Sequence, residues 1–113
     1  PWAHPLVAGV LDIRGTVVPA INLRSRLGHS QRPFGVEDRL LVVERGGRKV
    51  ALVVDEVMEV LEVTRRELEQ SSEVLTPCIS AVIRRDAGAI LLVLDVDEVI
   101  PADAVMQSPP RRS

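Results

Sequence analysis

The chain has 113 residues, which fits one domain and leaves no room for a second of full size. Hydrophobic residues make up 46% but aromatic residues only 2%, so we expect an aliphatic core, and the many β-branched residues favour strands. A net charge of −2 without a basic face, together with the lack of Tyr, argues against a nucleic-acid binder. No apolar run reaches the roughly 20 residues of a membrane-spanning helix, and no signal peptide is visible. Cys78 is the single cysteine, which suits a reducing cytoplasm.

The chain opens with a predicted hairpin. Residues 6–13 and 16–21 are rich in Val, Leu and Ile and flank Arg14-Gly15, where glycine permits a tight turn. Pro19 lies within the second strand and has no N–H to donate to a ladder, so we expect a sheet edge or a bulge there.

A short helical turn is expected next. Asn22 is a good N-cap for residues 23–27, and Gly28 is a common helix stop. The polar residues 29–38 predict a surface loop.

The strongest local signal is a second hairpin. Two apolar runs, residues 40–44 and 49–54, flank Gly46-Gly47, and a glycine pair suits the positive φ angles of a two-residue turn. Residues 57–63 then mix two periodicities. Their many β-branched residues favour a bent strand, and a short helix is the alternative.

The last third predicts helical turns around a third hairpin. Thr64 and Glu67 have the spacing of a capping box, and residues 69–77 predict a loop. Residues 79–85 and 89–94 predict two strands. Either Asp95 or Asp97 is expected to cap a helical turn through Ile100 that Pro101 terminates, and the domain is expected to span residues 1–106 with a disordered tail over residues 107–113.

The strands are short, are joined by hairpins and show no βαβ alternation. Several are apolar at nearly every position, so we expect both of their faces to be buried, as in small closed barrels that pack against each other.

Catalytic and metal-binding patterns are missing from the sequence. His4 and His29 are isolated from each other and from Cys78, and the acidic residues 95–98 lack the glycine and distal Glu of a calcium-binding loop. Gly46-Gly47 is not followed by the Lys-Ser/Thr of a phosphate-binding loop. We therefore expect no enzyme activity, no metal and no cofactor.

Three arginines lie beside turns. Arg14 is placed at the reversal of the first hairpin, and Arg24 and Arg26 lie on the short helical turn. They are either solvated charges or contacts to a protein partner, because Arg is enriched in interface hot spots.

Three ordered segments carry a family resemblance. Residues 9–24 read G-V-L-D-I-R-G-T-V-V-P-A-I-N-L-R, which resembles the CheW pattern G-V-x-N-L-R-G-x-I-x-P-V-x-D-L-R. Residues 50–57 are similar to the family's V-G-L-x-V-D-x-V, and residues 90–97 are similar to its L-x-x-L-L-D-x-D closing strand. The chain departs from the family by having Asn22 for Asp, Ala51 for Gly, and Ala81-Val82 where a Gly is expected.

The resemblance implies a mainly β fold: a pair of small five-stranded SH3-like barrels with short helical turns. The chain starts after the family's first strands, so we expect the first barrel to lack its N-terminal strands. An unpaired sheet edge would remain, and such an edge favours self-association.

The resemblance also implies function and site residues. Proteins of this family are non-enzymatic adaptors in the cytoplasm that couple the cytoplasmic tip of a chemoreceptor to the regulatory domain of a CheA-type histidine kinase. The alternative is the CheW-like regulatory domain at the C-terminus of such a kinase, and no nucleic acid or direct membrane insertion is implied. The expected receptor-binding residues are Gly9, Val10, Arg14, Val57 and Val60. The expected kinase-binding residues are Gly46, Gly47 and Ala51.

Overall fold

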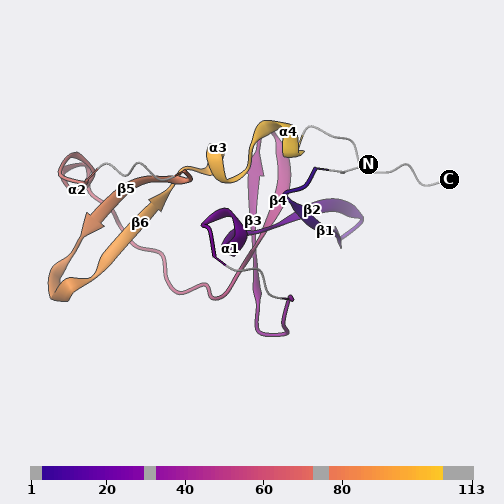
Figure 1. Cartoon of the computed structure of the whole chain (residues 1–113), viewed down its shortest axis with the longest axis horizontal. Coiled ribbons are helices and arrows are strands. Elements are labelled where there is room, and N and C mark those ends of the chain that lie inside the picture. The colour runs from indigo at the N-terminus through magenta and orange to yellow at the C-terminus, as the bar shows by residue number, and fades with distance from the viewer. Residues whose placement is uncertain (1–3, 30–32, 73–76, 106–113) are drawn as a thin grey trace. The chain divides into compact units, whose positions relative to one another are not determined.

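The computed structural model describes residues 4–29, 33–72 and 77–105 (Figure 1). It divides the chain into two compact units: residues 1–57 with 100–113, and residues 58–99. Described strands form a four-stranded sheet in the first unit and a two-stranded sheet in the second, joined by short helices. This confirms the mainly β prediction, although neither unit has five strands among its described residues.

The first unit begins with the predicted hairpin, β1 (Val7–Ile13) and β2 (Thr16–Asn22). The two strands are antiparallel, and their register shifts between Val7 and Gly9. Pro19 lies in an interior strand, because β2 also pairs with β4, so an edge position for Pro19 is wrong. Its missing N–H is tolerated because the parallel β2–β4 ladder begins only at the next residue, Ala20.

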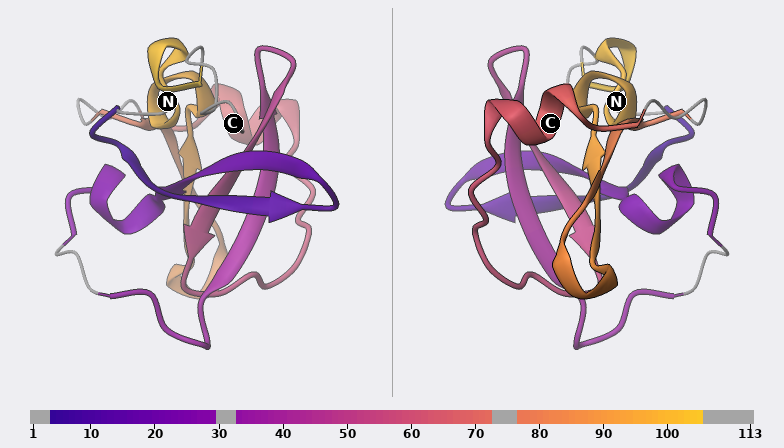
Figure 2. Two further views of the ribbon diagram at one scale, coloured as in Figure 1. Left: turned by 90° about the vertical axis from the view of Figure 1, so that its right-hand side faces the viewer. Right: turned by 90° about the vertical axis from the view of Figure 1, so that its left-hand side faces the viewer.

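The second hairpin is also confirmed. β3 (Arg39–Arg45) and β4 (Arg48–Val54) are antiparallel, and both turn glycines have positive φ, 59° for Gly46 and 79° for Gly47. The sheet order is β1-β2-β4-β3, and the β1–β2 hairpin lies across the β3–β4 hairpin (Figure 2). Edge strand β3 and interior strand β4 therefore have different surroundings.

Burial follows this order of strands. Residues 50–54 of β4 are all buried, and Leu11 and Ile13 of β1 pack against a small aliphatic core. This core cluster consists of Val18, Ala20, Ala51 and Val53. In contrast, Leu40 to Val42 of β3 are exposed. The prediction that apolar strands bury both faces holds for β4 and is wrong for β3, which is an edge strand among the described residues.

The short helix α1 (Leu23–Arg26) follows β2 without a gap. The Asn22 side chain is its N-cap and accepts a hydrogen bond from the Arg24 N–H at 3.0 Å, as predicted. Gly28 after the helix has φ of 82°. The amide oxygen therefore serves the cap in place of the family's carboxylate.

Residues 56–63 are neither strand nor helix in the structure. The predicted bent strand is wrong here, since a strand needs a neighbour to satisfy its backbone and none of the described residues pairs with this segment. β-branched composition alone does not supply that neighbour.

In the second unit, Thr64 caps α2 (Arg65–Glu69) in the predicted capping box. β5 (Ile79–Arg84) and β6 (Ile90–Leu94) form the third hairpin, which a short 3₁₀ turn, η1 (Asp86–Gly88), connects. Asp95 precedes α3 (Val96–Val99) and accepts a hydrogen bond from the Asp97 N–H at 3.0 Å, so Asp95 rather than Asp97 is the cap.

The chain leaves helical structure before Pro101, as predicted, and returns to it directly afterwards. A further turn, α4 (Ala102–Val105), follows it in the first unit, and the sequence analysis missed it. Proline ends one helix but also suits the start of the next, because its missing N–H is not needed there. The predicted tail over residues 107–113 lies outside the described residues.

Candidate functional site

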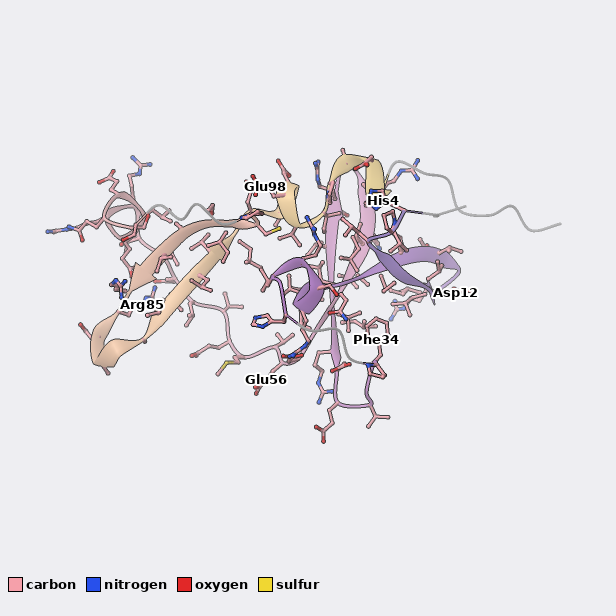
Figure 3. The ribbon with its side chains drawn as sticks, viewed as in Figure 1. His4, Asp12, Phe34, Glu56, Arg85 and Glu98 are labelled. Atoms are coloured by element: carbon pink, nitrogen blue, oxygen red, sulfur yellow. The ribbon has the colours of Figure 1, made fainter. Side chains whose placement is uncertain are left out.

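The turn between β1 and β2 presents Arg14 to solvent. Arg14 and Gly15 both have positive φ, 52° and 83°, and the Asp12 carboxylate accepts a hydrogen bond from the Gly15 N–H at 2.8 Å. Asp12 lies on the β1–β2 hairpin in Figure 3. Within the described residues, the Arg14 guanidinium has no hydrogen-bond or ion-pair partner, so it is available to an external acceptor.

β1 separates an outward and an inward face. Ala8, Val10 and Asp12 are exposed, whereas the residues between them are partly buried. Val10 is 49% exposed and faces Pro19 across the ladder. Gly9 is on the other face, and a Cβ built on it would meet nothing within 4 Å, so no close backbone approach requires glycine there.

Val57 and Val60 are both exposed, and Val60 is 100% exposed. They belong to the unpaired residues 56–63, and the unit boundary falls directly after Val57. Val10, Arg14 and Val57 thus lie in the first unit, whereas Val60 belongs to the second.

The expected kinase-binding residues divide into two kinds. Gly46 and Gly47 are exposed at the β3–β4 turn. Ala51 is fully buried in the core cluster. Its side chain packs in the core and is not exposed to a partner.

The sequence analysis missed an apolar pocket of about 570 Å³ beside α1 in the first unit. Its lining residues are Leu23, Arg24, Leu27, His29, Leu41, Val54, Asp55, Glu56 and Val57. The lining comes from three separate stretches of the chain, which no local pattern brings together. The glutamate of this pocket, Glu56, is labelled in Figure 3.

Arg24 forms an ion pair in this pocket and has a structural role. Arg24 Nη1 lies 2.8 Å from Asp55 Oδ2, which connects α1 to the end of β4. Arg24 therefore makes an internal contact and is not the free partner-facing arginine that its place beside a turn suggested. The spacing in the sequence gave no sign of this pair.

Two further polar contacts involve residues next to strands and residues on the short helices α3 and α4. His4, labelled in Figure 3, accepts a hydrogen bond at Nδ1 from the Leu6 N–H at 3.2 Å. Its other ring nitrogen, Nε2, lies 3.1 Å from Asp103 Oδ2 of α4. In the second unit, Glu98 accepts a hydrogen bond from the N–H of the buried Cys78 at 2.7 Å.

A polar network in the second unit centres on Glu67 and Arg85, of which Arg85 is labelled in Figure 3. Arg85 Nε lies 3.0 Å from Glu67 Oε2, and Arg85 Nη2 also donates to the Glu62 carbonyl. The backbone hydrogen bond from Thr64, with a smaller contribution from Arg85, lowers the pKa of Glu67. These contacts fix the start of α2 and offer no catalytic pair.

No group of three metal-ligating side chains comes together within residues 4–29, 33–72 and 77–105. None of the described helices is long and apolar enough to cross a bilayer. The features that remain for function are binding surfaces: the Arg14 turn, the exposed apolar side chains and the α1 pocket.

Comparisons with known proteins agree with a binding function. The family model of the CheW-like domain matches residues 1–104. The chain is 25% identical to chemotaxis protein CheW of Bacillus subtilis over 97% of this chain and 72% of that protein. It is 26% identical to chemotaxis protein CheW of Rhizobium meliloti, over 91% of this chain and 68% of that protein.

A solved structure has the same fold. The scaffolding protein TtCheW from Thermoanaerobacter tengcongensis superposes with a TM-score of 0.73 at 21% identity, over 92% of this chain and 73% of that one. This likeness fits the expected two-barrel architecture. The chain spans about two thirds to three quarters of the length of these three proteins.

Proposed function

The chain belongs to the CheW-like domain family, and we propose that it is a non-enzymatic adaptor coupling chemoreceptors to a CheA-type histidine kinase in chemotaxis-like two-component signalling. The observation that carries this proposal is the family match over residues 1–104, together with relatives named as chemotaxis proteins. Its work consists of coupled binding equilibria in the cytoplasm, and no covalent step is required.

The receptor surface is centred on Arg14. Its guanidinium has no partner among the described residues and presents several N–H donors in a fixed plane, which suits carboxylate or amide groups on a receptor helix. Val10, exposed on the outer face of β1, adds apolar area in the same unit. Val57 and Val60 supply exposed apolar side chains of the kind that a helix buries in a groove.

We assign the kinase surface to the β3–β4 turn. Gly46 and Gly47 are exposed there and leave the backbone open to close approach, because they have no side chains. The partner at this turn is the regulatory domain of the kinase. The rival assignment, a regulatory domain at the C-terminus of the kinase itself, predicts a histidine-kinase ATP-binding region in the same polypeptide.

The test of the receptor surface is a pull-down with the cytoplasmic tip of a chemoreceptor. Arg14→Ala is expected to reduce capture by about tenfold, the loss typical of one charge-assisted contact. Arg84→Ala on β5 is the matched control, since Arg84 is also an exposed arginine on a hairpin. Equal capture of wild type and Arg14→Ala would mean that Arg14 is an ordinary solvated charge that does not contact the receptor.

Within the part of the chain that the structure describes, the four-stranded sheet leaves two edges open, and we include self-association in the proposal. β1 and β3 are its outer strands. Unpaired backbone groups at such edges favour pairing with another chain.

A further inference from the structure

Arg14 has a backbone conformation that an arginine does not favour. It is the first central residue of the two-residue turn between β1 and β2, which Ile13 and Thr16 flank as a ladder pair, and its φ of 52° is left-handed. A Cβ is disfavoured in this conformation, and Asn, Asp or Gly is the usual residue at this place in the turn. A local contact is therefore expected to hold Arg14 in it.

The Asp12 side chain supplies that contact. Gly15 is the second central residue of the turn and lies outside both strands, so its N–H does not take part in the ladder. Asp12 Oδ1 accepts a hydrogen bond from this N–H at 2.8 Å; Asp12 is labelled in Figure 3. A carboxylate makes a stronger hydrogen bond than a neutral acceptor. The bond spans three residues, and Arg14 lies between its donor and its acceptor.

Asp12 is placed on the same face of β1 as Val10. Val10 and Asp12 are exposed, whereas Leu11 and Ile13 on the inner face pack against the aliphatic core. The inner face thus anchors the strand, and the outer face carries the carboxylate two residues before Arg14. Asp12 is therefore the side chain of the outer face that can set the conformation of the turn.

We propose that Asp12 is a positioning residue for Arg14. Its carboxylate holds the Gly15 N–H and so keeps Arg14 in the left-handed conformation in which its guanidinium meets the receptor; the inference rests on the proposed receptor surface. Without this acceptor, Arg14 is expected to relax to a negative φ, as in other turn types, and its side chain then leaves the backbone in another direction.

The structure assigns this role to an acceptor oxygen and not to negative charge. Asp12→Asn keeps an oxygen at the same place and removes the charge, whereas Asp12→Ala removes both. Positioning therefore predicts that Asn retains receptor binding and that Ala weakens it. An effect of charge alone predicts that the two variants behave alike.

Capture of the whole chain by the cytoplasmic tip of a chemoreceptor is the test. Asp12→Ala is expected to reduce capture by about threefold to tenfold, and Asp12→Asn is expected to remain within about twofold of wild type. Asp86→Ala is the matched control, since Asp86 is an exposed aspartate at the β5–β6 turn and its loss changes the net charge equally. Wild-type capture by Asp12→Ala, or equal capture by the Ala and Asn variants, would overturn the proposal.

A double variant separates positioning from a general loss of stability. If Asp12 acts through Arg14, then Asp12→Ala adds no further loss of capture once Arg14 is alanine. A merely structural role lowers capture by the same factor in both backgrounds. That result would overturn the positioning role.

Amide hydrogen exchange of Gly15 tests the contact without a partner. The protection of this N–H, the ratio of intrinsic to observed exchange rate, is expected to fall in Asp12→Ala and to persist in Asp12→Asn. Unchanged protection in Asp12→Ala would overturn the contact. Unchanged capture by Arg14→Ala would overturn the receptor surface itself, whereas a loss with Arg14→Ala and none with Asp12→Ala would overturn the positioning role alone.

Discussion

Arg24 on α1 and Asp55 at the end of β4 form an ion pair, 2.8 Å between Nη1 and Oδ2, across a separation of 31 residues. Both side chains are partly exposed, so solvent screens the pair and its contribution to stability is modest. The pair nevertheless fixes α1 against the sheet and forms one wall of the apolar pocket.

Removing this pair is expected to destabilise the first unit slightly. Asp55→Asn should lower the free energy of unfolding by about 0.5–1 kcal/mol, in keeping with a partly exposed ion pair. Urea denaturation of Asp55→Asn, Arg24→Gln and the double variant measures the coupling between them. Additive losses in the double variant would mean that the pair contributes nothing.

Arg14 is expected to lower the stability of the first unit and to strengthen receptor binding. It has φ of 52°, a left-handed conformation that costs a non-glycine residue about 1 kcal/mol. Asn-Gly is the favoured sequence for this kind of turn, so Arg14→Asn should raise the free energy of unfolding by up to about 1 kcal/mol while weakening receptor capture. Thermal unfolding and pull-down of the same variant give both readouts. A variant that loses stability and keeps receptor binding would contradict the assignment.

A side chain at Gly47 is expected to destabilise the β3–β4 turn. The φ of 79° at Gly47 penalises any L residue, although a Cβ there would meet nothing within 4 Å, so the cost is in the backbone alone. Gly47→Ala should lower the free energy of unfolding by about 1–2 kcal/mol. Gly9→Ala is the matched control, because Gly9 has equally open space around it and no positive φ. This variant should leave the free energy of unfolding unchanged or raise it by about 0.4 kcal/mol. Equal losses in both variants would contradict the backbone argument.

Acid is expected to weaken the start of α2. Hydrogen bonding to the Thr64 N–H, with help from Arg85, lowers the pKa of Glu67 from its ordinary value of 4.5. A carboxylate with a lowered folded pKa adds stability that is complete above that ordinary value and is lost as the pH falls below it. The protection of the amides in the first turn of α2, the ratio of intrinsic to observed exchange rate, should therefore fall as the pH drops below about 4.5, and Glu67→Gln should remove this dependence. Unchanged pH dependence in Glu67→Gln would contradict this role of Glu67.

Local sequence signals predicted most of the elements. Gly46-Gly47, the Asn22 cap and the Thr64–Glu67 capping box each act within a few residues, so the sequence alone places them. Residues 56–63 were predicted wrongly as a strand, because strand formation depends on a neighbour that β-branched composition cannot supply. The helical turn after Pro101 was missed because proline suits both the end and the start of a helix.

The candidate site was less accessible to sequence reasoning. The exposed Arg14 turn followed from the hairpin and the family pattern. The α1 pocket and the Arg24–Asp55 pair depend on contacts between distant segments, which spacing does not encode. Ala51 matched a family position, yet the order β1-β2-β4-β3 places its strand in the sheet interior and buries it.

The central claim is that one chain bridges a receptor and a kinase, and the most direct measurement is co-sedimentation with receptor tips. The receptor bundle is immobilised on vesicles, and the kinase regulatory domain is sedimented with and without the chain. The adaptor account predicts that the kinase domain sediments in proportion to added wild-type chain and much less with Arg14→Ala. Kinase sedimentation that does not depend on the added chain, or a chain that displaces the kinase from the vesicles, would contradict the account.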